Sequence, residues 1–263
     1  MTASSRPVVL VTGAARRLGR AMALELATHG FDVAVHYRGS AADAQATAAE
    51  LRALGARAET FQADLSIEAA CRALVPTVAA RFGRCDAIVN SASTFEYDDP
   101  TTFSVAAMDK HWRANTAPAV ILAQALHAHL AGGTAGQAKR GGCVVNIVDQ
   151  KLWNPNPDYF SYTLSKAALQ AATVMLAQAL APRVRVCGVA PGVTLASGPM
   201  DAQEFTAAHT MTPLQRSSTP ADIARAVRFL IESPAITGTT LLVDGGQHLA
   251  AQPRDVLYLA KKG

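Results

Sequence analysis

The stretch Thr12-Gly13-Ala14-Ala15-Arg16-Arg17-Leu18-Gly19-Arg20 decides the fold of this chain. It follows a short apolar, β-branched run at residues 7–12, typical of a buried strand, and leads into apolar residues at helical spacing over 18–28. In that context Gly13 permits a tight turn, and Gly19 permits close packing of the helix on the strand. The N-terminus of such a helix offers free N–H groups and partial positive charge to a pyrophosphate. The stretch therefore predicts a dinucleotide-binding turn between a strand and a helix.

Strands and helices alternate along the rest of the chain. Seven strands separated almost throughout by helices predict βαβ units and a parallel sheet. We expect an α/β fold: a single Rossmann-type, doubly wound, parallel seven-stranded sheet with helices on both faces. The 263 residues are 50% apolar, enough to bury one large core, so residues 1–263 are predicted to form a single domain that carries this dinucleotide-binding turn. The predicted strands are 7–12, 31–37, 58–63, 86–90, 143–148, 184–190 and 240–243; the predicted helices are 18–28, 41–54, 66–82, 104–131, 159–180 and 220–232, with a Gly-rich loop at 132–142.

Charge and cysteine usage narrow the functional class. The net charge is +4, but the first 38 residues hold five Arg against two acidic residues, and a basic cluster near a phosphate ligand explains that excess better than nucleic acid does. The four cysteines are far apart and form no C-x-x-C pair, so we expect buried free thiols, no disulfide framework and no metal site. The short polar N-terminus and the absence of a long apolar stretch predict a soluble cytoplasmic protein with no membrane segment.

The end of the second predicted strand indicates which cofactor binds. NAD-specific sites place an acidic residue there to bind the ribose 2′-hydroxyl, whereas this chain reads His36-Tyr37-Arg38-Gly39-Ser40. Arg16, Arg38 and Ser40 are candidates to bind a 2′-phosphate, since Arg matches phosphate geometry. We therefore predict NADP(H), with NADPH as the reductant. Arg17, which stands where a middle glycine is usual, either supplies charge near the phosphates or is an exposed residue of the first helical turn.

A candidate catalytic pair stands on the predicted helix 159–180, within Tyr162-Thr163-Leu164-Ser165-Lys166. A Tyr and a Lys four residues apart lie on one helix face, which brings the ammonium group near the phenol. A nearby ammonium group and an oxidised nicotinamide ring both favour the phenolate, so we expect them to lower the pKa of Tyr162 below the usual value of about 10. Tyr162 would then serve as a proton donor near neutral pH. This spacing alone is also common by chance.

Together with the glycine turn, Asn90-Ser91-Ala92-Ser93, Asn115 and Pro191-Gly192, this pair resembles the short-chain dehydrogenase/reductase family across essentially the whole chain. The resemblance implies that Lys166 binds the nicotinamide ribose and that Asn115 orders a water in the proton relay. Asp64 would lie by the adenine, although a residue at the start of a helix is the plain alternative. The cofactor-binding residues so implied are Gly13, Arg16, Arg17, Leu18, Gly19, His36, Tyr37, Arg38, Ser40, Asp64, Leu65, Asn90, Ala92, Ser93, Lys166, Pro191 and Gly192.

One residue departs from the usual pattern of that family. Most members carry a serine thirteen residues before the Tyr, to hydrogen-bond a substrate carbonyl, and this chain carries Asp149. An ionised carboxylate cannot donate a hydrogen bond and repels a forming oxyanion. A carboxyl group can instead help deliver a proton to the nitrogen of a C=N bond that is being reduced. The plain alternative is a carboxylate at a strand end that binds only water or backbone.

Asp149, Arg17, His36-Tyr37-Arg38 and Ser93-Thr94-Phe95 together resemble the pteridine reductases and their bacterial dihydromonapterin and dihydrofolate reductase relatives. The resemblance implies that Phe95 stacks on the pterin, unless it is a loop anchor, and that Ser93 contacts the pterin or a cofactor phosphate. The implied catalytic set is Asp149, Tyr162, Lys166 and Asn115; the implied substrate-binding set is Arg17, Ser93, Phe95, Asp149 and Tyr162.

The sequence thus predicts an NADPH-dependent pteridine reductase acting by hydride transfer with protonation by Tyr162 and Asp149. A carbonyl reductase of the same family, acting on an acyl thioester, sugar or small ketone, is the main alternative, and a non-catalytic NADP(H)-binding sensor is another.

Residues 193–214 are predicted to form a substrate lid. The apolar helix 167–181 suggests a subunit contact in a homo-oligomer, with a tetramer expected from the resemblance; deep burial of the helix inside the monomer is the alternative. The tail, 247–263, either docks on a neighbouring subunit or covers its own site.

Overall fold

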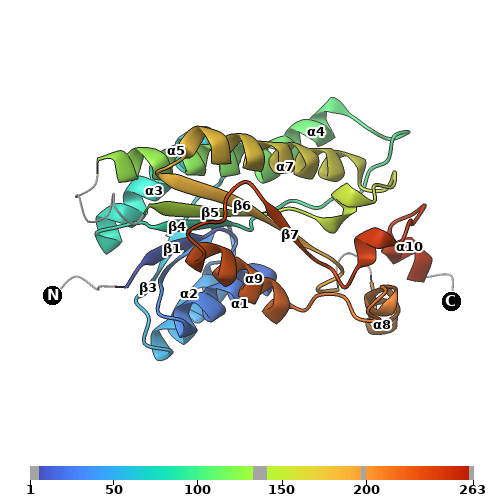
Figure 1. The fold of residues 1–263 in the computed structure, drawn as a ribbon, viewed down its shortest axis with the longest axis horizontal. Coiled ribbons are helices and arrows are strands. Elements are labelled where there is room, and N and C mark those ends of the chain that lie inside the picture. Colours follow the sequence, from blue (N-terminus) through green and yellow to red (C-terminus); the bar gives the residue numbers. More distant parts are fainter. Residues whose placement is uncertain (1–5, 133–140, 197–199, 261–263) are drawn as a thin grey trace.

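The computed structural model describes residues 6–132, 141–196 and 200–260, and it shows the predicted α/β fold (Figure 1). Residues 133–140 of the predicted loop and 197–199 of the predicted lid lie outside the described residues. The elements are β1 (Val8–Val11), α1 (Arg17–Thr28), β2 (Asp32–Tyr37), α2 (Ala41–Ala53), β3 (Ala58–Gln62), α3 (Glu68–Phe82), β4 (Ala87–Asn90), α4 (Val105–His111), η1 (Trp112–Thr116), α5 (Ala117–Ala131), β5 (Gly142–Ile147), η2 (Gln150–Trp153), α7 (Phe160–Leu180), β6 (Val184–Pro191), α8 (Ala202–Thr210), α9 (Pro220–Glu232), β7 (Thr240–Val243), η3 (Gln247–Leu249) and α10 (Val256–Ala260).

The seven strands form one sheet in the order β3-β2-β1-β4-β5-β6-β7, and every neighbouring pair is parallel. In β1, Val11 pairs with Val35 of β2 on one side and with Val89 of β4 on the other. From β1 the sheet grows on one side through β2 and β3 and on the other side through β4 to β7. The connections therefore run in opposite directions on the two sides of β1, and this leaves a crevice at the carboxyl ends of β1 and β4. That crevice is where the glycine turn after β1 lies.

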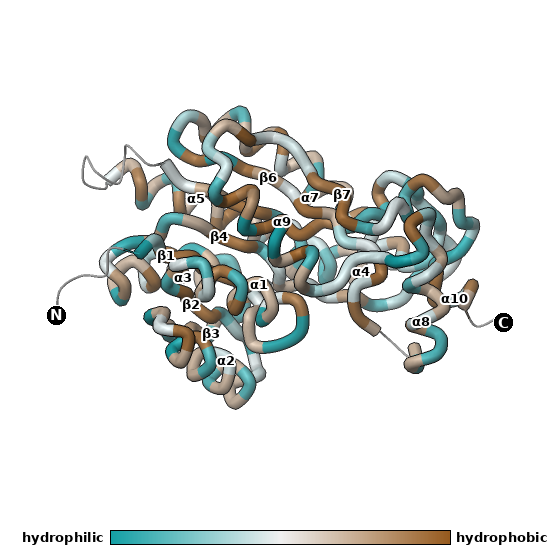
Figure 2. Tube along the Cα trace, turned by 60° about the horizontal axis from the view of Figure 1, so that its bottom comes forward, coloured by the Kyte–Doolittle hydropathy of each residue, from teal (hydrophilic) through white to brown (hydrophobic). Residues whose placement is uncertain are grey.

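Two layers of helices cover the sheet, as the sequence predicts. One core cluster joins α1, α2 and α9 to the sheet and includes Met22, Leu51 and Leu230; a second joins α3, α5 and α7 to the opposite face and includes Val78 and Leu126. Figure 1 shows α5 and α7 on one side of the sheet and α1 and α9 on the other. Apolar colour concentrates on the strands and on the helix faces turned to them in Figure 2, because a parallel sheet is buried on both faces.

The predicted helix 104–131 is divided by a π-helical turn, η1, which is a correction to the sequence analysis. The N–H of Ala117 bonds to the carbonyl of Trp112, five residues back, instead of four. Pro118 follows immediately and has no N–H to continue the ladder, so the hydrogen-bond register resets at this point. Short elements outside long periodic runs (α8, α10, η2 and η3) were also missed by the sequence analysis.

Helix α7 leaves Val174 and Met175 exposed on the single chain, at 38% and 67%. The predicted subunit contact through this helix stays a prediction that a sedimentation measurement would test.

All four cysteines are buried free thiols. No helix in the described part of the chain is long and apolar enough to cross a membrane.

Candidate active site

A cleft of about 760 Å³ opens at the carboxyl ends of the strands. Nearly all the residues that the sequence analysis singled out line it, although they come from seven separate stretches of the chain. Those that do so are Gly13, Arg16, Arg17, Leu18, Gly19, His36, Tyr37, Arg38, Ser40, Asp64, Leu65, Ala92, Ser93, Phe95, Asp149, Tyr162, Lys166, Pro191 and Gly192. Asn90 and Asn115 do not line the cleft.

The turn after β1 is shaped for close approach of a phosphate group. Gly13 has φ +66°, and a Cβ on Gly19 would lie 2.3 Å from the carbonyl oxygen of Gly13, so neither position accommodates a side chain. Helix α1 begins at Arg17, and Arg16 at its N-cap makes no side-chain cap hydrogen bond. The free N–H groups of this first turn therefore face the cleft between two arginines. Such a turn fits a dinucleotide pyrophosphate.

His36 stabilises this turn from behind. Its Nδ1 accepts a hydrogen bond from the N–H of Gly13 at 3.1 Å, and its Nε2 lies 3.1 Å from the carbonyl oxygen of Ala63. The ring must therefore be neutral, with its proton on Nε2. Burial lowers the pKa of His36 to about 4, which keeps it neutral at physiological pH. Its role in the structure is to brace the glycine turn against β3.

The side of the cleft next to β2 carries the groups expected to hold a 2′-phosphate. Arg38 follows β2 directly, and Ser40 stands at the N-cap position of α2, where its side chain makes no cap hydrogen bond. Arg16 lies 3.7 Å from Asp43, an exposed pair that is too weak to fix its side chain. Asp64 accepts hydrogen bonds from the N–H and hydroxyl of Ser66, which lower its pKa. Asp64 thus lines the cleft and shapes the turn before α3, which begins at Glu68, so it is not itself the first residue of that helix.

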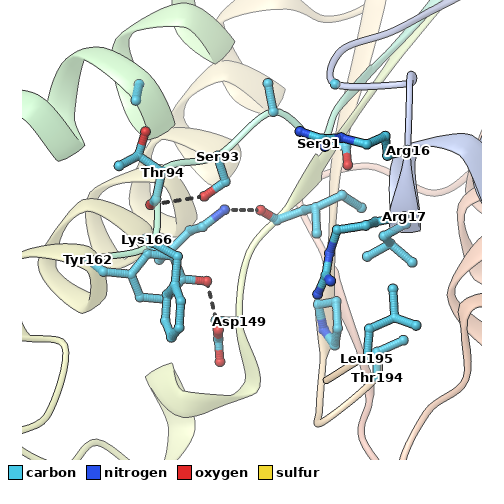
Figure 3. A pocket seen from close by; sticks show the side chains of 18 of the residues that line it. Arg16, Arg17, Ser91, Ser93, Thr94, Asp149, Tyr162, Lys166, Thr194 and Leu195 are labelled. Atoms are coloured by element: carbon cyan, nitrogen blue, oxygen red, sulfur yellow. Dashed lines mark hydrogen bonds between the residues drawn. The ribbon is translucent and has the colours of Figure 1, made fainter. Parts of the chain in front are cut away.

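Tyr162, Asp149 and Lys166 meet at the inner end of the cleft (Figure 3). The Tyr162 hydroxyl donates to Oδ2 of Asp149 at 2.8 Å, and the N–H of Lys151 donates to its Oδ1 at 2.9 Å. Lys166 Nζ donates to the carbonyl oxygen of Ile147 at 2.7 Å, and it stands 5.7 Å from the centre of the Tyr162 ring. The Asp149 carboxylate is therefore bonded to the phenol as well as to backbone, which excludes the alternative of backbone and water contacts only, and its part in proton delivery stays a prediction.

The expected direction of the Tyr162 pKa was wrong. Burial, and then the carboxylate of Asp149, raise the pKa of Tyr162 well above its ordinary value. Burial also raises the pKa of Asp149 and lowers that of Lys166 to about 8. Burial makes the largest contribution to this rise, and the carboxylate that bonds the phenol adds to it, whereas the ammonium is held on a backbone carbonyl. Tyr162 and Asp149 thus share one hydrogen bond in a buried setting that favours the neutral form of each group.

The two asparagines are placed differently from the expectation. Asn90 is buried and donates to Oδ1 of Asn146 at 2.8 Å, which ties β4 to β5 behind the cleft wall; the expectation that it lines the groove was wrong. Asn115 uses its whole amide: Oδ1 accepts from the N–H of Thr94 and from Ser93, and Nδ2 donates to the Thr94 carbonyl and to Ser165. The side chain therefore fixes the loop that follows β4, and its predicted part in a water relay stays a prediction.

That loop presents an aromatic surface. Phe95 stacks on Tyr159 with ring centroids 4.1 Å apart and meets the edge of Tyr162 at 4.7 Å. Its ring is nevertheless 40% exposed, so one side remains open to the cleft. A flat ligand ring can lie against it. Phe95 is both a loop anchor and a cleft residue.

Comparisons with known proteins agree with this geometry. A family model described as enoyl-(acyl carrier protein) reductase matches residues 13–248. The chain is 35% identical to pteridine reductase 1 of Leishmania tarentolae, over 94% of this chain and 98% of that protein. The crystal structure of FolM alternative dihydrofolate reductase 1 from Brucella canis, complexed with NADP, superposes with a TM-score of 0.88 at 40% identity, covering 96% and 98% of the two chains.

The chain belongs to the short-chain dehydrogenase/reductase family. A more distant relative, 3-oxoacyl-[acyl-carrier-protein] reductase of Synechocystis, is 32% identical over 94% of this chain and 98% of that protein. The likeness to both kinds of reductase leaves the substrate to be inferred from the site. Among the described residues, no group of three or more His, Cys, Asp and Glu side chains could hold a metal ion.

The structure also adds residues to this reductase site that sequence reasoning missed. Lys151 is buried beside Asp149, and the tail lies over its own cleft, where Asp255 and Leu257 are lining residues. Arg254 forms an ion pair with Asp158 at 2.8 Å. Within the single chain the tail therefore lines its own cleft, and its docking on a neighbouring subunit stays a prediction. The sequence carried no signal for these contacts, because an adjacent Arg and Asp in a polar tail indicate no partner.

Proposed function

We propose that this protein reduces a ring C=N bond of a pteridine, such as a dihydropterin, dihydromonapterin or dihydrofolate. The chain is an NADP(H)-dependent oxidoreductase of the short-chain dehydrogenase/reductase family. The observation that carries the substrate proposal is the Asp149 carboxyl, which is bonded to the Tyr162 hydroxyl at the inner end of the cleft. Residues 1–263 act in this proposal as a single domain, with 193–214 as its substrate lid.

The mechanism follows from the chemistry of the pair. When bound, NADPH supplies the hydride that reduces the ring carbon. Tyr162 delivers its proton to the adjacent ring nitrogen; the Asp149 carboxyl in its protonated form, which burial favours by raising its pKa, then donates a proton to the resulting phenolate and is itself reprotonated from solvent. The Lys166 ammonium, which donates to the Ile147 carbonyl, places a positive charge near the phenol. It would also donate a hydrogen bond to the ribose of the bound cofactor. Phe95 supports the flat ring on the side facing the aromatic loop.

The cofactor is held in this proposal by the residues of the dinucleotide cradle. Arg16 and Arg17 flank the pyrophosphate at the N-terminus of α1, while Arg38 and Ser40 bind the 2′-phosphate. The remaining proposed contacts are made by Gly13, Leu18, Gly19, His36, Tyr37, Asp64, Leu65, Ala92, Ser93, Pro191 and Gly192, all of which line the cleft.

Reduction of an acyl thioester is the competing activity, because the Synechocystis relative is named for it. A ketone develops negative charge on oxygen as it is reduced, and that charge needs a donor beside it. Asp149 accepts from Tyr162 and from the N–H of Lys151, so it offers such an oxygen no free donor while ionised. A protonated ring nitrogen, by contrast, is stabilised by the same carboxylate.

The test is NADPH consumption with dihydrobiopterin, dihydrofolate and acetoacetyl thioester side by side, with Tyr162→Phe as the inactive control. We expect kcat/KM for a pteridine to exceed that for the thioester by about 100-fold or more, since the buried polar groups reject a substrate that cannot pair with them. Efficient thioester reduction with no turnover of any pteridine would overturn the proposal.

A further inference from the structure

The C-terminal tail crosses the end of the cleft that carries Asp149 and Tyr162. Asp255, Val256 and Leu257 line that cleft, although they follow the last residue that the family model matches, 248. Figure 1 shows α10 beside α8, at the end of the molecule far from the N-terminus. The tail is therefore a part of the site that the shared family core does not supply.

A buried carboxylate anchors the tail. Asp158 is 2% exposed and accepts hydrogen bonds from Nε and Nη2 of Arg254, each at 2.8 Å. It also accepts from the N–H of Asp255 at 2.7 Å. A guanidinium bound through two nitrogens fixes orientation as well as distance. Arg254 is half exposed, so the geometry it imposes matters more here than the strength of the ion pair.

A second tie joins the tail to the segment that carries Asp149. Lys151 is 4% exposed, and its Nζ donates to the carbonyl oxygen of Asp158 and lies 3.4 Å from Oδ2 of Asp255. The same ammonium stands 5.5 Å from the centre of the Tyr159 ring. Residues 149–158 and the tail thus share one buried cation, which places the Asp255 carboxylate at the cleft wall.

The apolar side of the tail completes the wall. Leu257 is 4% exposed and belongs to one cluster with Tyr159 and Tyr162, against which Met200 packs. Tyr258 meets the edge of Tyr97 with ring centroids 5.8 Å apart. The tail therefore closes the space beyond the Tyr162 ring with an apolar side chain and a carboxylate placed two residues apart.

We propose that residues 254–257 are the wall that sets substrate specificity, with Arg254 as the positioning residue that holds Asp255 and Leu257 in place. The wall selects compact, flat heterocycles that present N–H groups to Asp255, and it excludes long flexible acyl chains. This inference rests on the proposed function, which it deepens by naming the segment that discriminates between the two substrate classes.

The test compares Arg254→Ala and Arg254→Lys with the wild-type enzyme, with Arg225→Ala as the matched control. Arg225 forms an exposed ion pair with Asp222 on α9, outside the cleft. We expect Arg254→Ala to raise KM for dihydrobiopterin about tenfold or more and to change kcat less than threefold. The dissociation constant of NADPH should stay within about twofold, since the tail is not among the proposed cofactor contacts. Arg254→Lys should recover part of the loss, and Arg225→Ala should behave as wild type.

An unchanged KM in Arg254→Ala would overturn the proposal, and so would a parallel weakening of NADPH binding, which indicates general unfolding of the cleft. Asp255→Asn, which keeps the size of the side chain, provides the second variant: KM for the pteridine should rise while KM for acetoacetyl thioester stays unchanged, and equal effects on both would refute the role of the carboxylate. If the wild-type enzyme reduces only the thioester, the proposed function fails, and the wall is then tested separately. In that case a lower thioester KM in Arg254→Ala supports the wall, and an unchanged one removes it.

Discussion

Replacing Asp149 with asparagine separates catalysis from stability at the same residue. Asparagine keeps the shape, and its Oδ1 can still accept from the N–H of Lys151, as Asp149 does at 2.9 Å. It cannot return a proton to Tyr162, whose hydroxyl donates to Asp149 Oδ2 at 2.8 Å. General acid catalysis contributes about 10²–10⁴-fold, so kcat for the pteridine should fall by that factor, or about 3–5 kcal/mol of barrier.

The stability of the same variant should change in the opposite sense. Burial raises the pKa of Asp149 in the folded protein. An acid with a raised folded-state pKa loses stability as the pH rises through its unfolded value, because the unfolded chain ionises first. Asparagine does not ionise and avoids this loss. The thermal midpoint of Asp149→Asn at neutral pH should therefore equal or exceed that of the wild type, and the difference should vanish below about pH 4.

The assay is steady-state pteridine reduction together with thermal unfolding monitored by circular dichroism. Asp86→Asn is the control, because Asp86 is a partly buried carboxylate that bonds Arg84 and the N–H of Val8 at the amino ends of the strands, away from the cleft. It should lower the thermal midpoint and leave kcat unchanged. Pteridine turnover by Asp149→Asn within tenfold of wild type would refute the assignment of Asp149 as a proton carrier.

Three further predictions follow from the cofactor side of the cleft. Arg38→Asp should reduce the ratio of kcat/KM for NADPH over NADH by about 10–100-fold, through the loss of a charge-assisted hydrogen bond; an unchanged ratio would exclude Arg38 as the 2′-phosphate ligand. Gly19→Ala places a Cβ 2.3 Å from the Gly13 carbonyl, and this overpacking should cost about 1–3 kcal/mol in urea unfolding and weaken NADPH binding. Burial lowers the pKa of His36 from 6.5 to about 4, so stability present above pH 6.5 should decline by about 3 kcal/mol as the pH falls to 4. His36→Asn should flatten that decline in a series of thermal midpoints against pH, and an unaltered slope would contradict it.

Several features of this protein follow from local sequence alone. The strand and helix periods place all seven strands within about two residues of their observed bounds, because the side-chain pattern of each element depends only on which face is buried. The glycine turn, the absence of an acidic residue after β2, and the spacing of Asp149, Tyr162 and Lys166 are likewise readable locally. A parallel sheet then gathers these residues at one edge, so nearly all of them line the same cleft.

Tertiary structure decided what depends on partners distant in the chain. Lys166 is four residues from Tyr162 in sequence, yet its ammonium bonds Ile147, and burial, together with the nearby Asp149 carboxylate, reverses the expected direction of the Tyr162 pKa. Asn90 turns to Asn146 behind the wall of the cleft. The ion pair between Arg254 and Asp158 spans 96 residues. The burial of these polar side chains, and the hydrogen-bond partner that each one finds, are set only when segments distant in the chain pack together. No local sequence pattern encodes them.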